Sequence, residues 1–342
     1  MTKTIRDEEH LEELLSEPTP GAIETLSALD GDVLILGAAG KMGPTLCRMA
    51  RRALEEAGSK RKVIAVSRFS DEAAEAKLQE WGVETHAADL LAPRAFEFLP
   101  EAPLVLYLAG RKFGAQGDLG LTWAMNSFLP GLVARRYHAS RIVAFSTGNV
   151  YPLSSPALGG SVESDPPVPV GEYAMSCLGR ERIFAYYAQQ NVTPTALLRL
   201  NYATELRYGV PVDIAGKVWR GEEIDLSMGA VNVVWQGDAN AWALQALGAA
   251  STPATTLNLA GPEILSVRRI AEFFARRFDR PALFVGQEAS QALLSNAQAV
   301  HARFGYPRVP VQALLEWIAD WTQRGGTTLD KPTHYETRDG RF

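Results

Sequence analysis

Three glycines follow a short apolar run near the start of the chain, at a spacing that suits a phosphate-binding turn. The run Val-Leu-Ile-Leu occupies residues 33–36, and Gly37, Gly40 and Gly43 come after it. One glycine permits the tight turn, one lets the backbone approach a pyrophosphate, and one lets helix and strand pack closely. The residues after Gly43 are helical in composition, so a helix N-terminus would face the anion. The alternative is a glycine-rich turn without a ligand. The sequence favours a dinucleotide site formed by Gly37, Gly40, Lys41, Met42 and Gly43.

The end of the next apolar run bears on the choice of cofactor. After the second strand of a dinucleotide fold, an acidic residue holds the ribose hydroxyls, whereas an arginine favours a 2′-phosphate. Here residues 63–66 are followed by Ser67 and Arg68, and no acid occurs before Asp71. Ser67 and Arg68 therefore favour NADP over NAD. The alternatives are that Arg68 is a solvated loop charge, or that it stacks on adenine without selecting the cofactor.

The residue counts argue against several other chemistries. The 342 residues include five histidines and two cysteines, and none has a spacing typical of metal ligands, so we expect no metal site. Two thiols fit a reducing cytoplasm. The net charge of −5 is a poor match for nucleic acid, so we expect no such partner. No stretch reaches the roughly 20 apolar residues of a membrane span, and the acidic N-terminus lacks the apolar core of a signal peptide.

The elements that must position the glycine loop alternate between strands and helices. Uninterrupted apolar strands indicate a parallel sheet that is covered on both faces. Right-handed crossovers then give a doubly wound α/β fold, a Rossmann domain. We expect strands at 33–37, 63–67, 104–110, 142–147 and 195–200, and helices at 44–57, 71–81, 121–138 and 173–190.

The rest of the chain is expected to divide around this domain. After residue 200 the alternation loosens, which indicates a smaller part that binds substrate. The tail contains the run KPTHYETRDGRF, which is too rich in specific side chains for a plain linker. The predicted parts are a helical extension (1–31), the Rossmann domain (32–205, with 236–262 returning to it), the smaller C-terminal substrate-binding part (206–235 and 263–330) and the polar tail (331–342).

Further landmarks resemble the extended short-chain dehydrogenase/reductase superfamily, and within it the NAD-dependent epimerase/dehydratase family. The segment at 145–152 resembles the family's Ser-Ser-x-x-Val-Tyr-Gly stretch, and the segments at 231–238 and 257–261 resemble its late helix entry and last strand. The resemblance implies cofactor contacts after the third and fourth strands and in the helix that follows. These residues are Asp89, Leu90, Leu108, Ala109, Gly110 and Asn126.

The resemblance also implies the reacting groups. Aligning on Val150 and Tyr151 puts Thr147 at the family's Ser/Thr position, with Ser146 just before it. Tyr173 begins a Tyr-Ala-Met-Ser-Cys run in place of Tyr-x-x-x-Lys. Tyr173 would then transfer a proton, and Thr147 would hydrogen-bond the reacting oxygen, with Ser146 as its neighbour or substitute. The alternative is that Tyr173 is a partly buried aromatic residue at a helix start.

Two positions depart from the family pattern. Cys177 stands where the family has a lysine that binds the nicotinamide ribose and lowers the tyrosine pKa. Residues four apart share a helix face, so Cys177 should still point toward the cofactor, but a neutral thiol cannot replace the ammonium. Arg180 and Lys112 are the candidate substitutes. In addition, Val231 stands where an arginine often contacts a nucleotide-sugar pyrophosphate.

The resemblance implies an NAD(P)-dependent oxidoreductase or epimerase that acts by hydride transfer on a sugar or a sugar-derived hydroxy compound. It also implies a homodimer, formed through the helices at 121–138 and 173–190. The alternative is a non-catalytic NAD(P)-binding sensor or interaction protein that has lost the lysine. A cation close to Tyr173 would separate the two hypotheses, because only the enzyme needs one.

Overall fold

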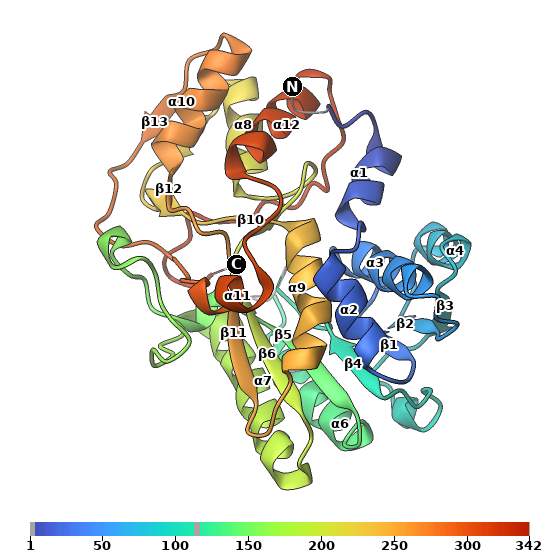
Figure 1. Ribbon diagram of the computed structural model, residues 1–342. Coiled ribbons are helices and arrows are strands. Elements are labelled where there is room, and N and C mark those ends of the chain that lie inside the picture. The colour runs from blue at the N-terminus through green and yellow to red at the C-terminus, as the bar shows by residue number, and fades with distance from the viewer. Residues whose placement is uncertain (1–3, 113–116, 342) are drawn as a thin grey trace.

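The central feature of the fold is a parallel sheet of seven strands. A computed structural model of the chain describes residues 4–112 and 117–341. The strand order is β11-β6-β5-β4-β1-β2-β3, so the chain winds outward from β1 in one direction and from β4 in the other (Figure 1). This order confirms the predicted doubly wound α/β fold. The strands are β1 Val33–Leu36, β2 Val63–Ser67, β3 Glu84–Ala87, β4 Leu104–Tyr107, β5 Arg141–Thr147, β6 Thr195–Leu200 and β11 Thr255–Leu259.

Helices cover both faces of the sheet because the strand side chains alternate between two apolar clusters. Val33 and Ile35 pack on one face, while Leu34 and Leu36 pack on the other. The first face is covered by α2 Pro20–Ala28, α3 Gly43–Glu56 and α9 Gln236–Ala249, and the second by α6 Leu129–Arg136 and α7 Gly171–Asn191. Helix α4, Glu72–Glu80, packs beside β3.

The single helix expected at 121–138 has a different form. It consists of α5 Leu119–Trp123, the π-helical turn η2 Ala124–Phe128, and α6. Pro130 has no backbone N–H and cannot continue the ordinary ladder to the carbonyl of Asn126. Instead, the N–H of Leu129 bonds to the carbonyl of Ala124, five residues back. This turn determines where Asn126 lies.

Segments that follow β6 build a smaller part at the end of the sheet, around an apolar cluster of its own (Figure 1). Asn232 lies between two of its short strands, and its side chain bonds to Asn201 and to the backbone of Ser295. The helices of the smaller part are α8 Val210–Arg220, α10 Val267–Phe278 and α12 Val311–Gln323. Its strands form three pairs: β7 Ala203–Thr204 with β10 Val234–Trp235, β9 Ala230–Val231 with β12 Leu265–Ser266, and β8 Glu223–Asp225 with β13 Leu283–Val285.

Two further helices join the parts. Helix α1, Glu8–Leu15, contacts α9 and α3, and its apolar side chains belong to the smaller part's cluster. Helix α11, Gln298–Phe304, packs against β11 and α9. Within the described ranges, no helix combines the length and the apolar character that crossing a membrane requires.

Candidate active site

The glycine loop joins the carboxyl end of β1 to α3, beside the position between β1 and β4 where the strand order reverses. Gly37 has a φ of +85°, and a Cβ on it would lie 2.6 Å from the backbone nitrogen of Ala109. A Cβ on Gly43 would lie 2.1 Å from the carbonyl oxygen of Ala38. At Gly40 the closest approach is 3.3 Å, to the Gly37 carbonyl. Packing therefore demands two of the three glycines, and the third leaves room for a ligand.

A cavity of about 380 Å³ opens beside this loop, a volume within the usual range for small-molecule sites. It lies at the carboxyl ends of the strands, where ligands bind in open α/β sheets. Of the residues predicted to contact cofactor or substrate, its walls include Gly37, Gly40, Lys41, Met42, Gly43, Leu108, Gly110, Ser146, Thr147 and Tyr173. Three distant segments also line it: Leu200–Ala203, Tyr208–Gly209 and the tail residues Leu329, Lys331 and Thr333. The remaining described wall residues are Arg111, Lys112, Phe145, Asn149 and Arg180.

Tyr173 and Thr147 meet in this cavity. Thr147 ends β5 and Tyr173 lies in the first turn of α7, and their side chains are hydrogen-bonded. The Thr147 hydroxyl also accepts bonds from the backbone and side-chain nitrogens of Asn149, at 3.2 and 3.0 Å. Burial raises the pKa of Tyr173 well above its ordinary value, and Thr147 and Arg180 oppose that rise. The phenol is thus protonated at neutral pH, and it is held by Thr147.

Ser146 has a different partner. Its hydroxyl donates to a carboxylate oxygen of Glu181 at 2.5 Å. Glu181 in turn forms a buried ion pair with Arg199, with an N–O distance of 2.8 Å. Although Ser146 also lines the cavity, its proton is committed to this network. Of the two adjacent hydroxyls, Thr147 is the one bonded to Tyr173.

Cys177 lies one helical turn beyond Tyr173 and is buried. It packs in a small cluster with Val150, Tyr151 and Tyr173. Burial raises the pKa of its thiol, which therefore stays protonated. Cys177 is absent from the described cavity walls, so its influence on the site passes through Tyr173.

Arg180 supplies a cation next to this pair. Its guanidinium is buried and donates to the carbonyl oxygen of Phe145 at 2.7 Å and to the Oδ1 of Asn126 at 2.8 Å. It lines the cavity and lowers the pKa of both Tyr173 and Cys177. Among the described residues, no carboxylate forms an ion pair with Arg180. Asn126, predicted to contact the cofactor, instead positions this guanidinium and accepts a bond from the N–H of Arg111.

Two lysines lie farther into the cavity. The Lys41 ammonium donates to the carbonyl of Ala203 at 2.8 Å and sits 3.9 Å from the ring centre of Tyr208. Burial lowers the pKa of Lys41 to about 7 and that of Lys112 to about 8. Lys112 donates to the carbonyl of Thr333 at 3.3 Å. Both ammonium groups are held in place by backbone carbonyls.

The other predicted cofactor residues lie at the ends of neighbouring strands. Ser67 ends β2, and the exposed Arg68 follows it. Asp89 and Leu90 follow β3; the Asp89 carboxylate accepts a bond from the N–H of Leu91, and Leu90 is buried. Ala109 is buried against Gly37. None of the five is among the described walls of the cavity.

Sequence reasoning missed the cavity residues that come from the smaller part and the tail. Tyr202, Tyr208, Lys331 and Thr333 belong to no recognisable motif. For the tail, the only signal was its unusual density of specific side chains. In the described part of the chain, no three His, Cys, Asp or Glu side chains gather as metal ligands would.

The sequence matches a known family over the glycine loop, the Tyr173–Thr147 pair and the strands between them. A family model described as "NAD dependent epimerase/dehydratase family" covers residues 33–203, half of the chain. The chain belongs to this family. That assignment confirms the predicted resemblance and makes the chain a member of a family of NAD-dependent enzymes. No curated protein matches it.

Solved structures of similar fold include sugar-nucleotide epimerases. A UDP-glucuronic acid 4-epimerase from Bacillus cereus, in complex with UDP-glucuronic acid and NAD, is 17% identical with a TM-score of 0.71, covering 86% of this chain and 99% of its own. A UDP-glucose 4-epimerase from Thermus thermophilus, in complex with NAD, is 19% identical with a TM-score of 0.69, covering 85% and 99%. At these identities the likeness establishes the fold alone.

Proposed function

We propose that this family member is an NAD(P)-dependent oxidoreductase or epimerase that acts on a hydroxyl of a sugar-like substrate. The observation that carries the proposal is the single cavity that joins the glycine loop to the Tyr173–Thr147 pair, with Arg180 beside it. The similar folds that bind UDP-sugars and NAD support the same substrate class. The smaller C-terminal part would bind the substrate.

The residues of the loop fit a dinucleotide. Gly40 leaves space where a side chain would obstruct a pyrophosphate, and the N–H groups at the start of α3 favour an anion. Lys41, Met42, Leu108 and Gly110 would hold the remainder of the cofactor. A bound nicotinamide supplies the hydride chemistry. Ser67 and the exposed Arg68, with no acid beside them, favour NADP over NAD.

Tyr173 would move the proton of the reacting hydroxyl. Because burial raises its pKa, the phenol keeps its proton at neutral pH and is present in the form that can donate to a carbonyl oxygen, whereas oxidation of a hydroxyl requires that the phenol first lose this proton. Arg180 offsets part of that burial, since a nearby positive charge stabilises a phenolate. In this scheme Arg180 takes the electrostatic role of the lysine that Cys177 replaces. Thr147 orients the phenol through their hydrogen bond.

The test compares turnover with binding. Purified protein is assayed with NAD and NADP against a panel of sugars, sugar acids and UDP-sugars, and cofactor affinity is measured by fluorescence. We expect turnover of at least one compound, a loss of about 10²–10⁴-fold in Tyr173→Phe, and unchanged cofactor affinity. Tyr306→Phe, at an exposed tyrosine outside the cavity walls, is the matched control. Cofactor binding with no turnover of any compound would favour the sensor.

The predicted homodimer has support in exposed apolar side chains on α5, η2 and α7. Trp123, Phe128, Met175 and Tyr186 are each more than a third exposed. Large apolar groups on two adjacent helices are typical of a buried interface. Light scattering after size exclusion should show a dimer for the native chain and a monomer for Phe128→Asp. A native chain that elutes as a monomer at micromolar concentration would remove this part of the proposal.

A further inference from the structure

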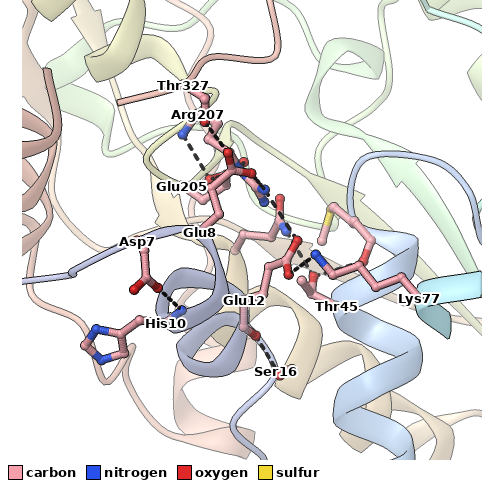
Figure 2. Close-up of polar contacts among 12 residues, drawn as sticks. Asp7, Glu8, His10, Glu12, Ser16, Thr45, Lys77, Glu205, Arg207 and Thr327 are labelled. Atoms are coloured by element: carbon pink, nitrogen blue, oxygen red, sulfur yellow. Dashed lines mark hydrogen bonds and ion pairs between the residues drawn. The ribbon is translucent and has the colours of Figure 1, made fainter. Parts of the chain in front are cut away.

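The tail after α12 forms a strap, residues 326–341, that is fixed at both of its ends. At its start, the Thr327 hydroxyl donates to a carboxylate oxygen of Glu8 at 2.9 Å, within the polar cluster around Arg207 (Figure 2). The N–H of Leu329 then donates to the carbonyl of Arg207 at 3.0 Å. Helix α1 and the loop after β7 therefore hold the strap where it approaches the cavity.

The strap continues past the cavity to the start of α7. Tyr335 is buried in the apolar cluster of the smaller part, and Arg338 donates to the carbonyls of Ser227 and Gln291. Gly340 packs so closely against Gly171 that a Cβ on Gly171 would lie 2.5 Å from the Gly340 carbonyl oxygen. The segment from 329 to 333 is thus held between two anchors and forms a wall of the cavity.

That wall adds a positively charged side chain to a cavity whose other described charged residues are also positive. The described cationic side chains in the cavity wall are Lys41, Arg111, Lys112, Arg180 and Lys331, and no described Asp or Glu lines it. Asp213 on α8 acts on Lys112 and holds the strap: its carboxylate oxygen accepts bonds from the N–H and hydroxyl of Thr333, at 2.8 and 2.6 Å. A bound anion would balance part of the positive charge that these walls bring together.

The cations separate into groups by position. Lys41 belongs to the glycine loop, and Arg180 sits beside Tyr173. Lys112 is bound to the strap through Thr333, two residues from Lys331. Within the described chain Lys331 forms no ion pair, and it reaches the cavity from the exposed side. Lys331 on the strap and Lys112 bonded to the strap thus both line the cavity where the tail forms its wall.

We infer that Lys331 and Lys112 form a subsite for an oxyanion of the substrate, a carboxylate or a phosphate. The inference rests on the proposed function, because it takes this cavity to be the substrate site. The strap thereby contributes to substrate specificity, because Lys331 is a cavity lysine that comes from the tail and not from the Rossmann domain.

The test measures binding to protein saturated with NAD or NADP. Calorimetry compares D-glucose with D-glucuronate, D-glucose 6-phosphate and UDP, so that the preferred probe identifies the source of the oxyanion. We expect the native chain to bind at least one charged probe 10-fold or more tightly than glucose. Lys331→Met should abolish that preference, while Lys331→Arg keeps it. Lys60→Met, at an exposed lysine in the turn between α3 and β2, is the matched control.

Two results would overturn the subsite: equal affinity of the native chain for glucose and all charged probes, or a charge preference that Lys331→Met retains. Thermal unfolding of each variant checks that it is folded. Because the readout is binding, it does not depend on turnover. Absence of turnover with a surviving charge preference would overturn the proposed function alone.

Discussion

Two arginines are buried on either side of β5, and they are neutralised in different ways. Arg199 on β6 is about 5% exposed and makes two-pronged contact with the carboxylate of Glu181 on α7. Arg180, the residue before Glu181, is about 6% exposed, and within the described residues it donates to the neutral oxygens of Phe145 and Asn126 and forms no ion pair. One guanidinium has its charge balanced at contact distance, and the other does not.

This difference in charge pairing indicates different roles for the two arginines. A paired charge has little field left at a distance, so the Arg199–Glu181 pair acts as a cross-link between helix and sheet. An unpaired guanidinium in a site shielded from water acts strongly on its neighbours. For Arg180 those neighbours are Tyr173 and Cys177. Under the proposed function, Arg180 would act on the reacting tyrosine, while the next residue of α7, Glu181, would hold the helix to the sheet.

The largest effect should come from breaking the paired arginine. Arg199→Met leaves Glu181 buried without its partner, and we expect a loss of about 3–5 kcal/mol in the free energy of unfolding. Urea denaturation followed by circular dichroism measures it. The double variant Arg199→Met/Glu181→Met removes both charges and should recover much of the loss. Equal stability of the single variant and the native chain would refute the cross-link.

Replacing the unpaired arginine should affect catalysis more than stability. Arg180→Met leaves no buried carboxylate behind, so its unfolding free energy should fall by less than that of Arg199→Met. We expect kcat to fall by about 10²-fold. Since Arg180 lowers the pKa of Tyr173, its loss raises that pKa and moves the rising limb of the oxidation rate to higher pH. Arg180→Lys should lie between the two, and an unchanged pH profile in Arg180→Met would contradict this role.

Restoring the family's lysine should add to the effect of Arg180. In Cys177→Lys a second cation faces Tyr173 and lowers its pKa, so the pH at which oxidation reaches half its plateau should fall by about 1 unit or more. Initial rates between pH 6 and 10 measure the shift. Cys177→Ala removes a group that raises the Tyr173 pKa without adding a charge, so its profile should move in the same direction but by much less than that of the lysine variant. Coincident profiles for the lysine and alanine variants would mean that this position does not govern Tyr173.

The smallest effect should come from the edge of the paired network. The Tyr151 hydroxyl accepts a bond from Arg199 at 2.6 Å and donates to Asn258 at 2.9 Å. Tyr151→Phe keeps the ring, so we expect a loss of about 1–2 kcal/mol in unfolding free energy and no change in the pH profile. A changed profile would show that the two arginine environments are coupled, through the contact between Tyr151 and Cys177.

The cofactor side of the site could be predicted because its chemistry lies in short segments. Gly37 and Gly43 are required by backbone contacts within or beside one turn, and such contacts leave a spacing in the sequence. Thr147 and Tyr173 follow from positions at the end of a strand and the start of a helix. The choice between Ser146 and Thr147 needed the structure, because both hydroxyls face side chains of α7 and only the contacts distinguish them: Ser146 bonds to Glu181, and Thr147 bonds to Tyr173.

The substrate side could not be predicted because its contacts join distant parts of the chain. Lys41 and Ala203 are 162 positions apart, and Lys112 and Thr333 are 221 apart. No local pattern predicts such pairs. The tail showed an unexplained density of specific side chains, but its role depends on where α1, α8 and α7 hold it.

The π-helical turn η2 has a consequence for how relatives of this chain should be aligned. A π turn accommodates one residue more than an α turn, and each residue of an α-helix rotates its successor by about 100°. Deleting one residue from 124–128 would turn the preceding part of the helix by that angle and direct Asn126 away from Arg180. A relative with a regular helix here should therefore show a one-residue gap, and an ungapped alignment would pair Asn126 with the wrong position.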